Sequence, residues 1–289
     1  MTATVPADEA HMPLEAHDAP IHIGAVSLRV ADLPTLTAFY RDMIGLRLIT
    51  QDEGQAVLGI GSLPLVRLIA GATAPASAAG LFHLAILLPS RGDLANWLAH
   101  AAAARLPLEG ASDHLVSEAL YLSDPEGNGI EIYRDRKRSE WPRTATGDIA
   151  MATERLDLQA LLREADGRGY AGMPAGTAMG HIHLRVGEVA AAEAFYHRKL
   201  GFDVMTHYPG ASFMASGGYH HHIAGNIWHS RGAGPRHTGE AGLASFELVA
   251  RDAEAFDALR GRILAAGGDE AGGSPTIADP WGNRIVLRR

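Results

Sequence analysis

The chain contains the same segment twice, and this internal duplication limits the folds open to it more than any other feature. Residues 28–49 read LRVADLPTLTAFYRDMIGLRLI, and residues 184–205 read LRVGEVAAAEAFYHRKLGFDVM. A second pair, DPEGNGI at 124–130 and DPWGNRI at 279–285, repeats at nearly the same offset, 155 residues against 156. Two repeats at almost one offset indicate two duplicated halves, each built from the same succession of elements.

Each half is itself double, because a strand, a helix and further strands follow one another twice. Alternating apolar residues over 25–30 predict a strand. After Asp32, apolar residues at helical spacing predict a helix that ends at Gly45. A second helix is expected near residues 92–104. The second, third and fourth units open near Leu81, Gly180 and Leu243.

The same pattern divides the chain into segments. Residues 1–20 are rich in Pro, Ala and acidic residues and are expected to form a flexible arm. Units one and two occupy residues 21–134, and units three and four occupy residues 180–289. Between them lies a connecting segment, 135–179, in which one short helix is expected near residues 156–165.

Composition excludes several classes of protein. With 47% hydrophobic and 20% charged residues in 289, the chain can bury a core. The absence of cysteine excludes disulfides, thiolate metal sites and a cysteine nucleophile. The net charge of −8 disfavours a nucleic-acid partner. No apolar run reaches the roughly 18 residues of a membrane span, and the first residues lack the features of a signal peptide, so we expect a soluble, cytoplasmic protein. The sequence leaves open whether it is a homo-oligomer.

Four βαβββ-like units, with the FY-containing helix after the first strand and the DPxGN turn before the last, resemble the vicinal oxygen chelate superfamily. This superfamily includes glyoxalase I, extradiol dioxygenases and bleomycin-resistance proteins. The resemblance covers about residues 22–134 and 180–289. It implies an α+β fold of two modules, each with a curved mixed sheet made by two units.

In that superfamily the metal ligands come from the first and last strands of the units. The matching positions here are Ala25, His83, His181 and Ser245 in first strands, and Glu131 and Val286 in last strands. Pairing units two and three collects His83, Glu131 and His181, whereas the other pairings within one chain leave the site incomplete. We therefore expect units two and three to form the metal module, with the two imidazoles within about 5 Å of each other. Units one and four would form a metal-free structural module.

Two histidines and one carboxylate are the facial triad of non-haem Fe(II) oxygenases, which leaves three coordination positions open. We expect Fe(II), with Mn²⁺, Ni²⁺ or Zn²⁺ as alternatives. Glyoxalase-like sites commonly use four protein ligands, two of them Glu, and this chain departs from that pattern. The alternative interpretation of a single strand histidine is a buried, hydrogen-bonded polar residue. His183 competes with His181, because residues two apart share one face of a strand.

Three consecutive histidines, His220, His221 and His222, fall in the stretch GGYHHHIAGN within the last strands of unit three. On a strand their side chains would alternate, so at most two could face a cavity as acid–base groups. His114 and Tyr121 precede Glu131 in an order similar to that of the extradiol dioxygenases, where they lie over the substrate. Candidate acid–base and orienting residues are therefore His114, Tyr121, His220, His221 and His222, and candidate substrate contacts are His183, Tyr219 and Asn226.

These segments together look like the catechol 2,3-dioxygenases with four units. The expected function is extradiol ring cleavage of a catechol with Fe(II) and O₂. Such a reaction needs no reductant, because the substrate itself supplies the electrons. The alternatives are a glyoxalase-like metal-dependent lyase or isomerase, and a non-enzymatic binding or resistance protein of the same superfamily.

Overall fold

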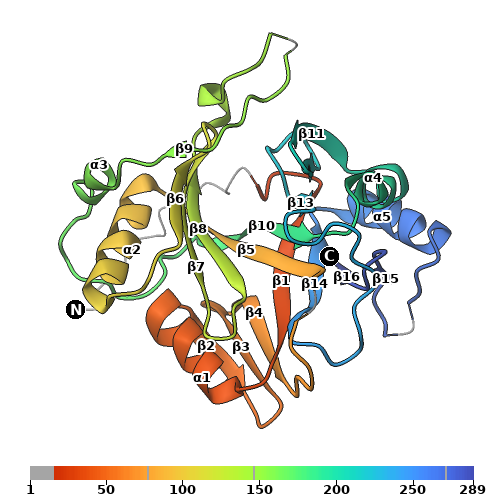
Figure 1. Cartoon of the computed structure of the whole chain (residues 1–289), viewed down its shortest axis with the longest axis horizontal. Helices are drawn as coiled ribbons and strands as arrows, with labels where there is room; N and C mark the ends of the chain where they lie inside the picture. The colour runs from red at the N-terminus through yellow and green to blue at the C-terminus, as the bar shows by residue number, and fades with distance from the viewer. Residues whose placement is uncertain (1–15, 77, 146, 271) are drawn as a thin grey trace, which may run out of the picture.

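A computed structural model describes residues 16–289 apart from residues 77, 146 and 271, and it contains two mixed sheets (Figure 1). Strands of units one and four form a seven-stranded sheet, in the order β15-β16-β14-β1-β4-β3-β2. Strands of units two and three, with β9 (Glu154–Arg155) of the connecting segment, form a nine-stranded sheet, in the order β11-β12-β13-β10-β5-β8-β7-β6-β9. The chain therefore pairs its inner units with each other and its outer units with each other, in an α+β fold with curved sheets.

The first half follows the expected order of elements. Unit one comprises β1 (Ile21–Val30), α1 (Leu33–Ala38), the π-helix η1 (Phe39–Ile44), β2 (Arg47–Gln51), β3 (Gln55–Ile60) and β4 (Leu63–Ala70). Unit two comprises β5 (Gly80–Leu88), α2 (Arg91–Ala104), β6 (Gly110–Asp113), β7 (Ser117–Ser123) and β8 (Gly129–Asp135). Asp32 caps α1 by accepting the amide of Thr35, and Gly45 ends η1 with φ of 94°, as the sequence predicts.

The second half repeats the pattern with one shortened unit. Unit three comprises β10 (Ala178–Arg185), α4 (Val189–Glu193), the π-helix η3 (Ala194–Lys199), β11 (Asp203–Tyr208), β12 (Ala211–Ala215) and β13 (Ile223–Asn226). Unit four comprises β14 (Gly242–Ala250), α5 (Ala253–Ala265), β15 (Thr276–Ala278) and β16 (Arg284–Arg288). In the described part of unit four, the remaining strand of the βαβββ pattern is reduced to a bridge between Asp269 and Thr276.

The connecting segment contains more structure than the one expected helix. It comprises the 3₁₀ turn η2 (Arg138–Glu140), β9 (Glu154–Arg155) and α3 (Leu158–Leu162). Between β8 and β9 it projects beyond the nine-stranded sheet, at the top of Figure 1. β9 pairs with β6, so this part of the connecting segment forms the edge of the nine-stranded sheet.

The start of the described chain is also more ordered than expected for an arm. Residues 1–15 lie outside the described part, but Ala16 and Ala19 are 0% and 2% exposed. The expectation of a flexible arm therefore does not hold for Ala16 and Ala19, which are packed into the fold, whereas Asp18 between them is exposed.

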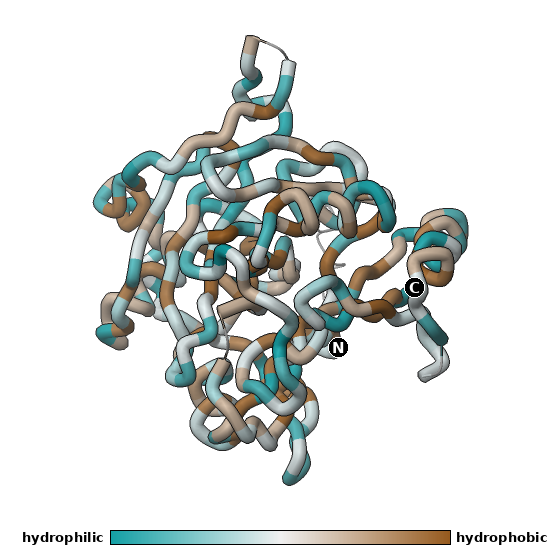
Figure 2. The backbone as a smooth tube through the Cα atoms, turned by 45° about the vertical axis from the view of Figure 1, so that its right-hand side comes forward, coloured by the Kyte–Doolittle hydropathy of each residue, from teal (hydrophilic) through white to brown (hydrophobic). Residues whose placement is uncertain are grey.

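One large apolar core joins the two sheets. It combines residues of β1 and β14 with residues of β5 and β10, and the helices cover it. A smaller core lies on the opposite face of the nine-stranded sheet, around Ala85, Tyr133 and Tyr219. Figure 2 shows apolar (brown) and polar (teal) residues interspersed along the backbone. Among the described residues, no helix is both long and apolar enough to cross a membrane.

The two repeated motifs meet in space, which explains why they recur together. The Tyr40 hydroxyl of unit one donates to Asp124 of unit two at 3.1 Å, and Tyr196 of unit three donates to Asp279 of unit four at 2.8 Å. Each carboxylate also accepts two amide hydrogens of its own turn. Because the paired units belong to different sheets, each Tyr–Asp contact fastens one sheet to the other.

We predict that Tyr40→Phe lowers the free energy of unfolding by roughly 1–3 kcal/mol, since the buried Asp124 carboxyl loses a hydrogen-bond donor. Urea unfolding followed by circular dichroism measures this change. Tyr208→Phe is the matched control, because the Tyr208 side chain is 47% exposed. Equal stability of the two variants would contradict the proposed fastening role of Tyr40.

Candidate metal centre

Three ligand side chains converge around Ala85 on one face of the nine-stranded sheet. Glu131 on β8 lies opposite Ala85 in the parallel ladder, and His181 on β10 lies opposite it in the antiparallel ladder. His83 precedes Ala85 by two residues on β5 and therefore shares its face. The three side chains are buried, and their ligand atoms lie within 4.8 Å of one another. This separation agrees with the expected distance between the two imidazoles.

The donor atoms of this triad suit a divalent cation. Glu131 Oε2 lies 3.0 Å from His83 Nε2 and 3.2 Å from His181 Nε2. The contact with His83 lacks hydrogen-bond alignment, so His83 Nε2 is buried without a hydrogen-bond partner among the described residues. Burial opposes ionisation of Glu131, but the adjacent His181 and His83 hold the pKa of its carboxyl well below the usual range. Burial lowers the pKa of His181, which favours a neutral, metal-binding imidazole.

The seven-stranded sheet has a different arrangement at the matching place. The positions that correspond to the ligands are occupied by Ala25, Ser245 and Val286. Glu247 lies opposite Val286 and accepts the amide hydrogen of Ala25 at 3.2 Å. Arg67 and Arg288 each lie 3.0 Å from its carboxylate. An internal ion-pair network therefore takes the place of a metal triad in this module.

A cavity of about 380 Å³ lies beside the triad and has Glu131 in its wall. Four of the residues expected from the sequence also line it: His114, Tyr121, His183 and His221. The cavity is therefore where the metal triad and the candidate acid–base groups meet, and it has the size of a small-molecule site.

The histidine run does not lie on a strand, and this corrects the expected alternation. Residues 216–222 form the connection between β12 and β13, in which Gly217 and Gly218 have φ of 64° and 71°. His220, His221 and His222 are 0%, 6% and 0% exposed. Only His221 lines the cavity, while the other two point to different partners behind it.

His221 is held by a buried chain of hydrogen bonds. Its Nδ1 lies 2.8 Å from His220 Nδ1, and His220 Nε2 lies 2.8 Å from Asp135 Oδ1. Because a carboxylate only accepts hydrogen bonds, Nε2 of His220 carries a hydrogen. With His220 neutral, its Nδ1 accepts from His221, which leaves Nε2 of His221 as a free proton acceptor. Burial, followed by the neighbouring histidines, keeps the pKa of His221 well below its usual value.

Comparisons with known proteins agree with this geometry. A model of the family described as "Glyoxalase/Bleomycin resistance protein/Dioxygenase superfamily" matches residues 22–132 and 178–287. The chain belongs to this superfamily. The resemblance drawn from the repeated motifs is thereby confirmed.

One relative within the superfamily is similar along nearly its whole length. It is named catechol-2,3-dioxygenase, from Bacillus subtilis (strain 168), and is 39% identical over 268 residues, which are 90% of this chain and 94% of the relative. A solved structure of a putative dioxygenase from Bacillus subtilis subsp. subtilis str. 168 has a TM-score of 0.58 at 14% identity, over 92% of this chain and 84% of that one. Glyoxalase I from Zea mays has a TM-score of 0.57 at 15% identity, over 94% and 93%. The two structures show that the fold is shared.

Tyr121 lies directly opposite Glu131 in the β7–β8 ladder, a relation that the intervening turn hides in the sequence. His114 Nδ1 donates to the carbonyl of Ala152 at 2.7 Å, so its Nε2 accepts the Tyr121 hydroxyl at 2.7 Å. Burial and the nearby Glu131 carboxylate raise the pKa of Tyr121 well above its usual value. Tyr121 therefore stays a hydroxyl that can donate a hydrogen bond. Ala152 of the connecting segment fixes the orientation of its partner, His114.

His183 lines the cavity, but the other two expected substrate contacts do not. Asn226 is fully buried behind His183, and its amide nitrogen lies 3.0 Å from His183 Nε2. Tyr219 is also fully buried, and its hydroxyl donates to Asp135 at 2.7 Å. The expectation that Asn226 and Tyr219 touch substrate is therefore not met; they hold residues that lie closer to the cavity.

His222 is a structural residue that ties the start of the described chain to unit three. Its Nε2 donates to the carbonyl of Ala16 at 2.9 Å, and its Nδ1 accepts the amide hydrogen of Ser216 at 3.2 Å. Both ring nitrogens are thus engaged in the neutral form. Burial lowers the pKa of His222 to about 3, against 6.5 for the free side chain.

This shift predicts acid sensitivity of folding. Between pH 6.5 and 3 the unfolded chain binds a proton at His222 that the folded chain excludes, so stability present above pH 6.5 is lost as the pH falls. Between pH 7 and pH 5 the wild type should lose about 2 kcal/mol more than His222→Gln, which has no such proton site. Urea unfolding of both proteins at the two pH values measures the difference. Parallel losses would refute a neutral His222.

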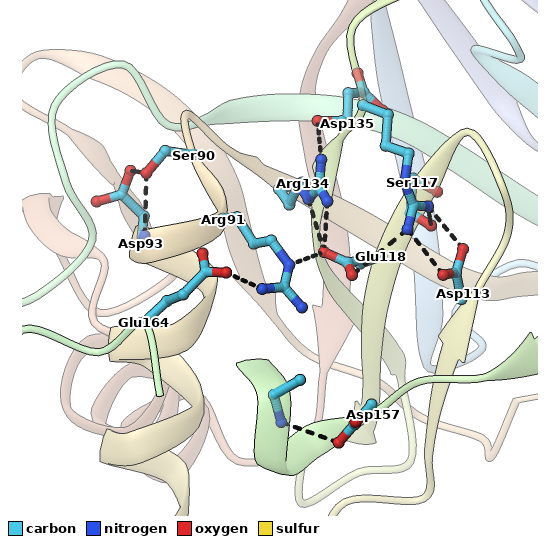
Figure 3. A network of polar contacts seen from close by, with 12 residues as sticks. Ser90, Arg91, Asp93, Asp113, Ser117, Glu118, Arg134, Asp135, Asp157 and Glu164 are labelled. Carbon is cyan, nitrogen blue, oxygen red and sulfur yellow. Dashed lines mark hydrogen bonds and ion pairs between the residues drawn. The ribbon is translucent and has the colours of Figure 1, made fainter. Parts of the chain in front are cut away.

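A network of ion pairs stiffens the strands that carry Tyr121 and Glu131 (Figure 3). Glu118 on β7 is buried and accepts from Arg91 at 2.7 Å and from Arg134 at 2.8 Å. Burial opposes ionisation of Glu118, but these guanidinium groups outweigh it and lower the pKa of its carboxyl. Arg136 is bound through both terminal nitrogens to Asp113, at 2.7 and 2.8 Å. The cations beneath this part of the sheet therefore already have anionic partners.

Sequence reasoning missed most of the cavity wall. Phe82, Phe213 and Trp228 are aromatic lining residues from β5, β12 and the loop after β13. Met151 and Thr153 come from the connecting segment, which had been expected only to join the halves. Phe82 could have been found, because it adjoins the ligand His83. The segment around Met151 carries no motif, and its place depends on the pairing of β9 with β6.

Proposed function

We propose that this protein is an Fe(II)-dependent extradiol dioxygenase that cleaves the ring of a catechol. The observation that carries the proposal is a buried triad of two histidines and one carboxylate beside an apolar cavity. The relative from Bacillus subtilis named catechol-2,3-dioxygenase supports the same chemistry. A three-ligand site with one carboxylate leaves room for both catechol oxygens and dioxygen, which a fourth protein ligand would restrict.

His83, Glu131 and His181 would hold the metal. An iron(II) ion there would supply Lewis acidity that lowers the pKa of a catechol hydroxyl, together with coordination positions for the substrate and dioxygen. His83 and His181 would bind as neutral groups, and Glu131 would provide the one protein anion that offsets the cation.

The remaining side chains would transfer protons and orient the substrate. His221 Nε2 would accept the proton of a catechol hydroxyl, and its Nδ1 hydrogen can move toward His220, whose charge Asp135 would balance. The same nitrogen would return a proton later in the reaction. Tyr121 would donate a hydrogen bond to substrate oxygen in exchange for its bond to His114. Phe82 and Trp228 would exclude water from the ring.

The test is metal reconstitution under anaerobic conditions, followed by addition of catechol and air. We expect one iron per chain, consumption of one O₂ per catechol, and a yellow ring-cleavage product. Iron-loaded protein that consumes no O₂ with any catechol would refute the proposal. Activity with Ni²⁺ or Zn²⁺ on a thiol adduct would instead favour a lyase or isomerase.

A further inference from the structure

The cavity beside the triad selects for substrate charge. We propose that it accepts uncharged catechols, with alkyl, aryl or similar neutral substituents, and rejects catechols that carry a carboxylate or another anionic group. This inference rests on the proposed function, and it names the class of substrate within it.

The wall of the cavity offers no permanent cation to an anionic substituent. Its described lining contains neither lysine nor arginine, and its one carboxylate is Glu131. Two of its histidines, His183 and His221, are buried and already have partners within the protein, since His183 Nε2 lies 3.0 Å from the Asn226 amide and His221 Nδ1 lies 2.8 Å from His220 Nδ1. His207 lies at the exposed end and already contacts Glu193 at 2.7 Å. A carboxylate in this cavity would be desolvated without a partner.

Arg136, which contacts the cavity wall, cannot serve as that partner without breaking contacts. Arg136 approaches the cavity through its hydrogen bond to the carbonyl of Ser117, a lining residue. It is held by the bidentate contact with Asp113 and lies 3.6 Å from Glu118. Asp113 thus already neutralises this guanidinium group, and Glu118 is shared with Arg91 and Arg134, so a substrate anion would have to displace an existing partner of Arg136.

The aromatic side chains in the wall are suited to a neutral ring. Phe82 lies 4.9 Å from His183 and 5.6 Å from Trp228 between ring centroids, in edge-to-face arrangements. Phe213 lies 5.7 Å from His183 in the same manner. These rings form an apolar clamp near the metal triad, and they stabilise an aromatic substrate by area and ring geometry, without charge.

A separate cavity offers a competing route for an acid. It has a volume of about 250 Å³, and Arg185 and His83 lie in its wall. Phe82 lines both cavities, and the Arg185 guanidinium lies 5.9 Å from its ring. Tyr121 also lines both cavities, so a substituent that passes between them could reach Arg185, and Arg185 therefore provides a direct check on the proposal.

The decisive experiment compares three catechols of similar size that carry an ethyl group, a carboxymethyl group, or the primary amide of that acid at the same ring carbon. Binding to the iron-loaded full chain is measured by anaerobic titration calorimetry, and turnover is measured separately. We expect the ethyl and amide compounds to bind at least about tenfold more tightly than the acid, which corresponds to 1.4 kcal/mol or more.

A charge added at the cavity rim should reverse this preference in part. Thr153 is exposed and lines the cavity, so Thr153→Lys places an ammonium group beside the substituent. We expect this variant to bind the acid at least about fivefold more tightly than the wild type does, with little change for the ethyl compound. Thr50→Lys, on the distant edge strand β2, is the matched control and should change neither.

The outcomes separate the two levels of the proposal. Equal or tighter binding of the acid by the wild type overturns the charge selection, while ring cleavage of both compounds leaves the dioxygenase function standing. Acid binding that disappears in Arg185→Gln would assign the substituent to the second cavity and also overturns it. Failure of all three catechols to bind or react refutes the dioxygenase function, and the charge selection with it.

Discussion

Replacing Glu131 by alanine should leave the protein unable to retain its metal. The carboxylate is the single anion of the triad, and its Oε2 lies within 3.2 Å of both histidines. Without it, two neutral imidazoles face an uncompensated divalent charge in a buried site. Metal analysis after anaerobic reconstitution and desalting should show close to one iron per chain for the wild type and almost none for Glu131→Ala. Ring-cleaving activity should vanish with the metal.

Val286→Ala is the matched control, because Val286 occupies the equivalent position in the seven-stranded sheet. It is partly buried, so the expected effect is a loss of about 1 kcal/mol in the free energy of unfolding, with metal content unchanged. Stoichiometric iron in Glu131→Ala, or loss of iron in Val286→Ala, would move the metal site away from the triad.

His221→Ala should keep its iron and lose turnover. His221 lines the cavity, whereas the ligand atoms of the metal site belong to other residues. Removing its Nε2 removes the proton acceptor beside the substrate, for which a fall in kcat of about 10²–10⁴-fold is the usual range. Steady-state oxygen consumption at saturating catechol, with iron content measured on the same sample, tests both parts.

The neighbouring positions distinguish a catalytic role from a structural one. Asp135→Asn should weaken the hydrogen bond that orients His220 and lower kcat by a smaller factor, about tenfold. His220→Ala should also keep its iron. His222→Gln should affect stability more than kcat, because His222 binds backbone atoms outside the cavity. If His221→Ala turns over normally, the proton acceptor must be His114 or His183; if it loses iron, the coordination sphere includes a fourth ligand.

The triad could be predicted because its positions follow from strand register. His83, Glu131 and His181 occupy matched places in repeated units, and the two ladders that meet at Ala85 bring such places together. The same logic gave the pairing of inner with inner units, since the complete ligand set existed in that pairing alone.

The conformation of the histidine run could not be predicted in the same way. The sequence places the run within the last strands of unit three, where side chains would alternate, but Gly217 and Gly218 adopt positive φ and turn the chain before β13 begins. The partners that then orient the rings, Asp135 and Ala16, lie far away in the sequence. The local sequence pattern therefore identified the three histidines, while long-range contacts determine that His221 alone of the three lines the cavity.

Along the sequence, the strands of the nine-stranded sheet all lie between the two halves of the seven-stranded sheet, and this order has a consequence for protein synthesis. The seven-stranded sheet closes where residue 21 meets residue 250, whereas the strands of the nine-stranded sheet all lie between residues 80 and 226. A ribosome therefore completes the strands of the nine-stranded sheet first. Until β14 emerges, the side of β1 that pairs with β14 stays unpaired. We expect nascent chains arrested after unit three to assemble the metal triad, while their exposed β1 edge makes them substrates for chaperones or prone to aggregate.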